Sequence, residues 1–316
     1  MSLMTMTETH GMTAAAEVWR VDDGGLGVTL DSGVYGSAES LRLVSDEMTL
    51  AAGEGLAGAV LARKVPVLLD ELDEESFERC GPANASDVTA AIGLPIFDEG
   101  RMSSVLVVMF RGQPGMKGAV ELWAGRRGRF ELGLTAAHYA GLERFGKVSR
   151  YVNFPMGSGL PGEVWQSAAP RILTGLGQSR AFLRSSGAES AGLKTGFGFP
   201  VIHRNELSAV MLWLSSEDTP LAKIYEVWET TDGTPETLWR THCDAKWVPG
   251  YTDAVPASPM KPVSEAARLR RPVLFEDPAA LGLEVETCVQ EAGVFCGVAI
   301  PVLVHDRVRA VALLAW

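Results

Sequence analysis

The sequence Gly159-Leu160-Pro161-Gly162-Glu163-Val164-Trp165 begins a short helical run that ends before Pro170, and the apolar strand Arg171-Ile172-Leu173 follows it. Proline suits the first turn of a helix, because the amide hydrogen that it lacks has no partner within the helix there. This stretch therefore predicts a short helix, a proline and a buried strand in immediate succession.

The same order of features occurs twice more in the chain. One copy reads Gly55-Leu56-Ala57-Gly58, then 59–63, then Pro66-Val67-Leu68-Leu69. Another reads Ser264-Glu265-Ala266-Ala267-Arg268, then Pro272-Val273-Leu274-Phe275, and it has Lys261 and Ser264 where the other copies have glycine. A second proline follows each copy at the mouth of an expected hairpin, at Pro95, Pro200 and Pro301.

The spacing of these features indicates a repeat. Each copy is preceded by a Glu-x-Trp sequence, and the three tryptophans, Trp19, Trp123 and Trp228, lie 104 and 105 residues apart. The distance from tryptophan to first proline is 47, 47 and 44 residues, and from first to second proline 29, 30 and 29. A solenoid repeat has only about 20 to 50 residues, so each copy is predicted to be a whole domain. The predicted domains are residues 14–112, 118–216 and 223–316.

The composition is that of a folded protein with a net negative charge. The 316 residues are 47% hydrophobic and 21% charged, and the net charge is −11 with a pI near 5.0. Such a surface is repelled by phosphate backbones and acidic lipids, so neither nucleic acid nor membrane is expected as a partner. No apolar run approaches the roughly 20 residues of a membrane helix.

The four cysteines form no Cys-x-x-Cys pair, and no His-x-x-x-His or His-Glu-x-x-His pattern occurs. The sequence therefore predicts no metal site and no cofactor. No secretory signal precedes Trp19. Reduced thiols and a cytoplasmic location are expected.

Several elements of the first copy can be predicted from local patterns. Residues 14–21 and 26–34 are expected to form a hairpin across Asp22-Asp23-Gly24-Gly25. Alternating apolar residues in 40–50 predict an extended segment. The acidic stretch 70–79 is compatible with a helix that turns Phe77 inward.

These patterns resemble the GAF domain family. The resemblance is carried by Gly55-Leu56-Ala57-Gly58 with Gly93-Leu94-Pro95, and by Gly159-Leu160-Pro161-Gly162 with Gly196-Phe197-Gly198-Phe199-Pro200. It covers nearly the whole chain and is weakest in the third copy. It implies an α+β fold of tandem GAF-like domains, each a central antiparallel β-sheet with short helices on one face. It also implies a small-molecule pocket between the sheet and the variable helical stretch.

The chain departs from that family at its joints. The family typically carries long helices at both ends of the domain, whereas 111–119 and 215–222 are short and contain Pro114 and Pro220. The last strands are nevertheless apolar on both faces, at 105–110, 209–214 and 310–316. Strands of this kind are buried on both sides. The uncovered sheet faces are therefore predicted to pack on one another, within the chain or in a homodimer.

The expected pocket has candidate residues in all three copies. The second copy supplies most of them, since basic and aromatic residues gather around its variable stretch 178–193. Surface charge also explains Arg171, Arg180, Arg184 and Lys194, and core packing also explains the aromatic residues. The candidate ligand-binding residues are Trp165, Arg180, Phe182, Arg184, Lys194, Thr195 and Phe197, with Phe77 in the first copy and Cys288 and Cys296 in the third.

The cysteines and histidines singled out here have simpler interpretations than a redox or metal-binding role. Cys288 and Cys296 are eight residues apart, and buried small hydrophobic residues are the simpler reading than a redox pair. His203 and His305 follow the second prolines, where exposed hairpin turns are expected.

Three functions remain open. The first is a non-catalytic sensory or regulatory protein that binds a small molecule and takes part in signal transduction through a partner. The second is a thiol-based redox enzyme similar to free methionine sulfoxide reductase. The third is a structural or interaction scaffold without a ligand.

Overall fold

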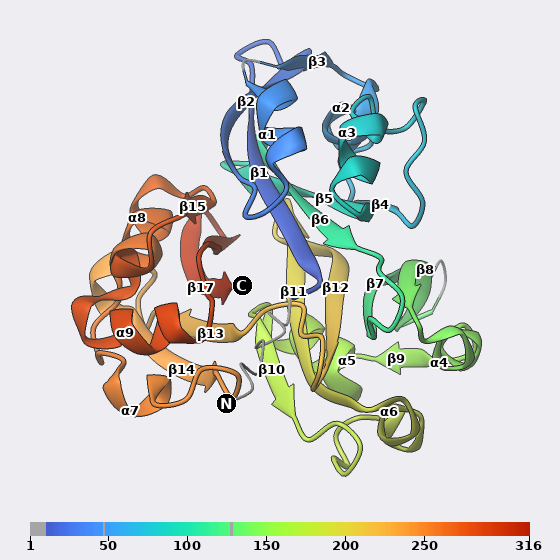
Figure 1. The fold of residues 1–316 in the computed structure, drawn as a ribbon, viewed down its shortest axis with the longest axis vertical. Coiled ribbons are helices and arrows are strands. Elements are labelled where there is room, and N and C mark those ends of the chain that lie inside the picture. Colours follow the sequence, from blue (N-terminus) through green and yellow to red (C-terminus); the bar gives the residue numbers. More distant parts are fainter. Residues whose placement is uncertain (1–10, 47, 127–128) are drawn as a thin grey trace, which may run out of the picture.

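A computed structural model of the chain describes residues 11–46, 48–126 and 129–316. These residues form three antiparallel β-sheets, two of six strands and one of five (Figure 1). We call each sheet, together with the helices between its strands, a unit, and number the units along the chain. The expected α+β class and short helices are confirmed.

Unit 1 contains six strands in the order β3-β2-β1-β6-β5-β4. Its elements are β1 (Thr13–Val21), β2 (Gly27–Val34), α1 (Glu39–Ser45), β3 (Thr49–Ala51), α2 (Gly55–Arg63), β4 (Val67–Leu69), α3 (Cys80–Ala85), β5 (Val88–Asp98) and β6 (Arg101–Arg111). The hairpin expected from the first two strands is confirmed, because β1 pairs antiparallel with β2.

Unit 2 has the equivalent strand order, β9-β8-β7-β12-β11-β10. Its elements are β7 (Gly118–Gly125), β8 (Glu131–Ala140), α4 (Glu143–Ser149), β9 (Asn153–Pro155), α5 (Gly159–Ser167), β10 (Arg171–Thr174), α6 (Ser185–Ala191), β11 (Leu193–His203) and β12 (Glu206–Ser216). The sequence Gly159-Leu160-Pro161-Gly162 therefore forms the start of α5, and β10 follows that helix.

Unit 3 has a five-stranded sheet in the order β14-β13-β17-β16-β15. Its strands are β13 (Ile224–Glu229), β14 (Trp239–Asp244), β15 (Val273–Phe275), β16 (Gly297–Val304) and β17 (Arg307–Ala315). Its helices are η1 (Pro235–Thr237), α7 (Tyr251–Ala254), α8 (Lys261–Leu269), η2 (Pro278–Leu281) and α9 (Leu283–Glu291). This sheet has no counterpart of β3 or β9 in its strand order.

The missing edge strand of sheet 3 explains why units 1 and 2 require a glycine that unit 3 lacks. A Cβ atom on Gly58 of α2 would lie 2.1 Å from the carbonyl oxygen of Ala51 in β3, and one on Gly162 of α5 would lie 2.2 Å from that of Pro155 in β9. Only glycine permits so close an approach. Ser264 holds the corresponding position in α8, where no equivalent edge strand competes for the space.

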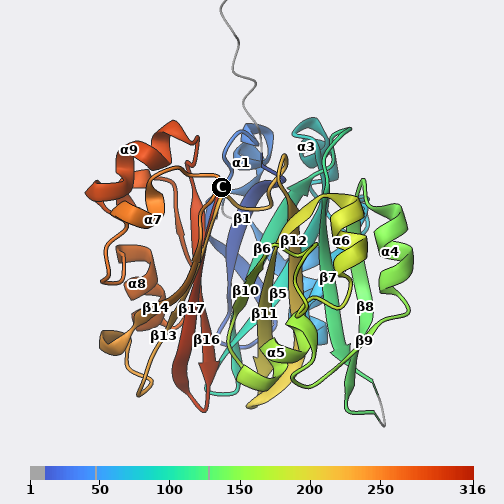
Figure 2. The ribbon, with the colours of Figure 1, turned by 90° about the horizontal axis from the view of Figure 1, so that it is seen from below.

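The three sheets pack on one another through the faces that their helices leave uncovered. One hydrophobic cluster contains Leu94 and Leu106 of sheet 1, Phe197 and Trp213 of sheet 2, and Ile300 and Ala312 of sheet 3. The helices α4 and α6 lie outside sheet 2, and α7 and α8 lie outside sheet 3 (Figure 2). The apolar faces are therefore covered within the chain, as the first of the two expected arrangements requires.

The second prolines of the repeat meet at the centre of this arrangement. Pro95 of β5, Pro200 of β11 and Pro301 of β16 line one narrow space of about 20 Å³. The same position in each copy therefore faces the common axis of the three units.

Two local predictions for unit 1 need correction. Of the predicted extended segment 40–50, only the end at 49–50 lies in a strand, β3, whereas residues 39–45 form α1. The helix puts Leu41 and Ser45 on one buried face, where the Ser45 hydroxyl donates to the Leu41 carbonyl. The stretch 70–79 contains no helix, because Asp73 Oδ1 accepts from the amides of Glu75 and Ser76 and holds a turn. Phe77 is nevertheless buried, as expected.

Candidate functional site

The Glu-x-Trp sequence of each copy places a buried carboxylate beneath the helices. In unit 2, Trp123 Nε1 donates to Glu121 Oε2 at 3.0 Å and the Tyr139 hydroxyl donates to Oε1 at 2.8 Å. Arg184 donates from Nη1 to Glu121 Oε1 at 2.6 Å, from Nη2 to Oε2 at 2.8 Å, and from Nη1 to Ser149 Oγ at 2.6 Å. Both carboxylate oxygens thus have charge-assisted partners.

Unit 1 repeats this network. Trp19 and Tyr35 donate to Glu17 at 3.0 and 2.9 Å, and Arg79 binds the Glu17 carboxylate with both Nη atoms and also contacts Ser45 Oγ. The two tyrosine hydroxyls have raised pKa values, because burial and the neighbouring carboxylate both disfavour the phenolate.

The guanidinium of Arg184 is also surrounded by aromatic rings. Its Cζ atom lies 4.7 Å from the centroid of Phe145, 5.2 Å from Phe182, 5.3 Å from Trp123 and 5.8 Å from Phe154. Rings at these distances attract a cation. The space between the sheet and the helices of unit 2 is therefore filled by side chains that contact one another.

Unit 3 keeps the carboxylate but takes its cation from another element. Trp228 Nε1 donates to Glu226 Oε2 at 2.8 Å, and Arg240 of β14 donates to Oε1 at 3.1 Å. Burial raises the pKa of Glu226, against the lowering effect of Trp228 and Arg240. Burial and Glu226 raise the pKa of the nearby Cys243 thiol to about 12.

Of these networks, the predicted site residues included only Arg184. Glu121, Tyr139 and Ser149 were missed, although the sequence carries a signal for them. The tyrosine follows the glutamate by 18 residues and the serine follows it by 28 residues in both of the first two copies. The recurrence of polar residues at fixed offsets, and not only of apolar ones, would have identified the buried network.

A groove lies between α4 and α6 of unit 2, and Arg184 of this network forms part of its lining. It has a volume of about 580 Å³, within the range of small-molecule sites. Its apolar lining includes Leu142, Phe145, Val148, Val152 and Leu183, and its polar lining includes Lys117, Glu143, Arg144, Arg184, Ser186 and Ser190. We call it the α4–α6 groove. It borders the variable stretch 178–193, whereas the pocket was predicted between that stretch and the sheet, where side chains fill the space.

The structure brings only part of the predicted site together. Arg184 lines the groove, and its Nε atom is buried without a hydrogen-bond partner among the described residues. Phe182 is buried beneath it, and Trp165 is half-buried against the same core. Arg180 is exposed, and Lys194 lies at the surface 3.4 Å from Glu217.

The remaining candidates lie away from the groove. Thr195 donates to Asp244 Oδ2 of unit 3 at 2.6 Å, and Phe197 packs in the central cluster, 5.9 Å from the ring of Tyr225. Phe77 lies in unit 1, with the Arg79 guanidinium 5.1 Å from its ring. Arg171, from the basic set, pairs with Glu229 of unit 3 at 2.9 Å.

The two cysteines of unit 3 belong to different clusters. Cys288 contacts the cluster beneath the helices, whereas Cys296 is part of the central cluster. Burial raises the pKa of both thiols, that of Cys296 to about 12. These positions favour the reading of both residues as small hydrophobic side chains.

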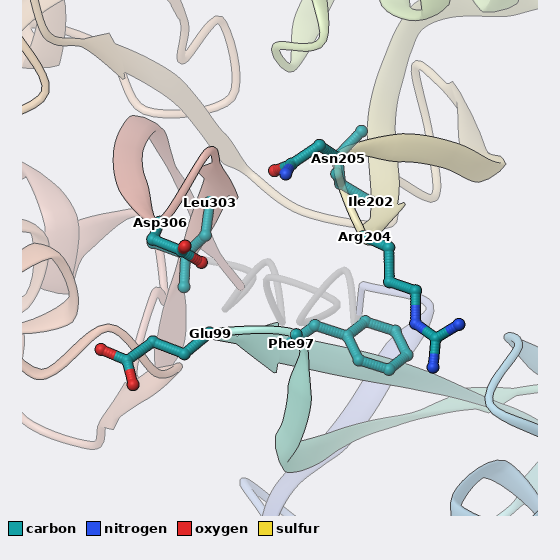
Figure 3. A pocket seen from close by; sticks show the side chains of 8 residues that line it. Phe97, Glu99, Ile202, Arg204, Asn205, Leu303 and Asp306 are labelled. Atoms are coloured by element: carbon teal, nitrogen blue, oxygen red, sulfur yellow. The ribbon is translucent and has the colours of Figure 1, made fainter.

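A second cavity lies where the hairpins of the three sheets meet (Figure 3). All three sheets contribute to its lining. Sheet 1 supplies Phe97 and Glu99, sheet 2 supplies Ile202 and Asn205, and sheet 3 supplies Leu303 and Asp306. The His305 amide donates to Asn205 Oδ1 at 2.6 Å, and His203 stacks on Phe97 with ring centroids 4.1 Å apart. His203 is thus half-buried in a contact between units and is not the exposed turn residue expected. At about 260 Å³ this cavity is small for an organic ligand.

Two general findings concern the described part of the chain. It contains no group of three or more His, Cys, Asp or Glu side chains placed to hold a metal ion. None of its helices has the length and apolar character needed to cross a bilayer.

Comparison with known proteins finds similarity at the level of structure only. No family model matches the sequence, and no curated protein is significantly similar to it. Several solved structures that resemble part of the chain are GAF domains.

The GAF domain/HD domain protein from Geobacter sulfurreducens is 15% identical with a TM-score of 0.28, covering 34% of this chain and 67% of its own. A Staphylococcus aureus NreA protein mutated in its nitrate binding site is 17% identical with a TM-score of 0.27, and the match covers 34% of this chain and 79% of the NreA chain. Free methionine-R-sulfoxide reductase from Neisseria meningitidis is 13% identical with a TM-score of 0.26, and the match covers 34% of this chain and 56% of the reductase chain. Likenesses this weak say nothing about ligand or activity.

Proposed function

We propose that the chain is a non-catalytic regulatory protein of three tandem GAF-like domains, residues 14–112, 118–216 and 223–316. It binds a small molecule in the α4–α6 groove of the second domain and signals through a protein partner. The observation that supports binding is the groove itself, about 580 Å³ of space lined by α4 and α6. The apolar sheet faces that suggested a homodimer are covered within the chain, so the partner is proposed to be a different protein.

The lining of the groove favours a ligand with an apolar body and an anionic group. Phe145, Val148 and Leu183 supply apolar surface, and Val148 and Leu183 are 55% and 52% exposed. Lys117 and Arg144 are the cations of the rim and outnumber its one carboxylate, Glu143. Charge-assisted hydrogen bonds from such cations are the strong polar contacts of small-molecule sites.

The test is a thermal-shift and calorimetric screen with 3-phenylpropionate and octanoate as probes, compared with the alcohols 3-phenylpropanol and octanol. Ser190→Trp fills the groove from α6, and Gln178→Trp adds the same ring in the same segment but outside the lining. We expect the carboxylates to bind the wild type and the Gln178→Trp variant, and not the Ser190→Trp variant. Equal binding to both variants contradicts the assigned site, and no binding of any probe contradicts the ligand class.

A scaffold without a ligand is the second candidate. It is favoured by the buried Glu17–Arg79 and Glu121–Arg184 networks, which occupy the space between sheet and helices in units 1 and 2. The thiol enzyme has less support, because Cys288 and Cys296 belong to separate clusters. The free cysteines are consistent with the proposed cytoplasmic location.

A further inference from the structure

A third cavity lies at the junction of units 1 and 2, and it is separate from the α4–α6 groove. Its volume is about 660 Å³. Three parts of the chain line it: the segment after β4 with α3 and β5 of unit 1, the connection 112–116 between the units, and β8 of unit 2. We call it the junction cavity. Its size suits a small organic molecule.

Two side chains that line the junction cavity carry a buried polar atom without a partner. His138 Nε2 and Thr89 Oγ1 are each shielded from solvent, and neither has a hydrogen-bond partner among the residues that the structure describes. Buried polar atoms in folded proteins are nearly always hydrogen-bonded, so two orphans in one cavity point to a bound molecule that supplies the missing groups.

The position of His138 makes it a hydrogen-bond acceptor. It lies on the face of β8 that also carries Ala136 and Ala140, which pack on the central cluster, and beside the segment that follows β4. Burial lowers the pKa of His138, which favours the neutral ring, and the backbone of Asp70 is a hydrogen-bond partner for it. A neutral ring that donates one N–H to that carbonyl offers its other nitrogen as an acceptor.

The charged groups of the junction cavity are of one sign. Asp70 and Glu71 stand at its rim, and no Lys or Arg is among the described residues that line it. The lining thus combines two carboxylates, an imidazole nitrogen and a hydroxyl oxygen. A metal ion is a poor fit, because these side chains do not form a metal-binding group in the described structure.

We propose that the junction cavity binds a small organic cation that carries several N–H donors, such as a guanidinium or primary ammonium compound. The cationic end lies between the carboxylates of Asp70 and Glu71, and a second donor reaches inward to His138 Nε2 and Thr89 Oγ1. Such a ligand contacts both units and the connection between them, so its binding restrains the joint.

The test uses agmatine and putrescine as cationic probes and 1,4-butanediol as a neutral probe of the same length as putrescine, measured by isothermal titration calorimetry on the full chain. The double variant Asp70→Asn/Glu71→Gln removes the rim charges. The double variant Glu74→Gln/Glu75→Gln removes the same charge from exposed residues of the same segment that do not line the cavity. All four positions are exposed, so folding is expected to be unaffected.

We expect saturable binding of agmatine to the wild type and a dissociation constant about tenfold higher or more in Asp70→Asn/Glu71→Gln, because charge-assisted hydrogen bonds are lost. In Glu74→Gln/Glu75→Gln it should change by less than about twofold, since these two side chains do not line the cavity. Thr89→Val, which removes the inner oxygen at constant size, should weaken agmatine without lowering the melting temperature.

Three results would overturn the site. They are the absence of saturable agmatine binding, equally tight binding of the diol and putrescine, and losses of the same size in the two double variants. The last result would mean that the overall negative charge attracts the probes. None of these results bears on the α4–α6 groove, which is tested with different probes and variants.

Discussion

Glu121 and Arg184 form a two-point ion pair in the interior of unit 2, with Nη1 to Oε1 at 2.6 Å and Nη2 to Oε2 at 2.8 Å. The two residues are 63 positions apart, on β7 and immediately before α6, and their side chains are 0% and 2% exposed. The pair therefore ties the helical layer to the middle of the sheet. Glu17 and Arg79 do the same in unit 1.

Breaking this pair from one side should be costly. Arg184→Met leaves a buried carboxylate without its cation, and we expect the free energy of unfolding to fall by about 3–5 kcal/mol. Urea denaturation measures the change. Arg180→Met, at an exposed position in the same segment, is the control and should change stability by less than about 0.5 kcal/mol.

Removing both partners should cost less than the sum of the single changes. In Glu121→Gln/Arg184→Met no charge remains unpaired, so we expect part of the loss to be recovered. A double-mutant cycle by urea denaturation gives the coupling. Strict additivity of the single changes would contradict the interpretation of the pair as one buried unit.

The glycine requirement should differ between the copies. Gly58→Ala and Gly162→Ala put a methyl group against the Ala51 and Pro155 carbonyls, and we expect each to lose about 1–3 kcal/mol of stability or more. In α8 the Cβ is already present, so Ser264→Ala, which removes only the hydroxyl, should cost less than about 1 kcal/mol. Melting temperatures of the three variants measure this. Wild-type melting temperatures in Gly58→Ala and Gly162→Ala would contradict the close approach of helix and edge strand.

The central cluster should contribute strongly to stability. Phe197 is fully buried between sheet 2 and Tyr225 of sheet 3, so Phe197→Ala is expected to cost about 3–5 kcal/mol. Trp165→Ala, at a half-buried site on α5, is expected to cost less. If the units were held only by their connections, Phe197→Ala would unfold unit 2 and leave unit 3 with its wild-type transition, which differential scanning calorimetry would detect.

The thiols of Cys243, which is half-buried, and Cys296, which is buried, should be unreactive in the folded protein. Burial raises the pKa values of Cys243 and Cys296 to about 12, so at pH 8 both are thiols and not thiolates. We expect them to react with Ellman's reagent only after unfolding. Rapid reaction of Cys296 in the native state would reopen the redox interpretation.

The same shift predicts a direction for stability against pH. A thiol whose folded pKa is about 12 ionises later than in the unfolded chain, where the value is near 9. The unfolded state therefore loses protons first, and stability should fall as pH rises from about 9 towards 12. Urea midpoints at pH 8, 9 and 10 should show a smaller decline in Cys243→Ser than in the wild type.

Local patterns predicted some elements well and others poorly. The apolar residues of 14–21 and the turn at 22–25 were sufficient for the first hairpin, because both signals are local. The helix at 39–45 was missed, because Leu41 and Leu43 alternate as in a strand and only the packing of Leu41 inward decides between the two structures. Arg180 and Lys194 were grouped with Arg184 by proximity in sequence, although only Arg184 turns inward.

The sequence by itself determined the three-fold recurrence of one pattern, the α+β class and the apolar character of both faces of the last strands, because these follow from the order and spacing of residues. Only the tertiary structure decided that the uncovered faces meet within one chain. The tertiary structure also decided that Glu121 pairs with Arg184. It decided as well that α8 can carry Ser264 at the position where α2 and α5 need glycine. These outcomes depend on distances between residues far apart in the chain, which local periodicity does not encode.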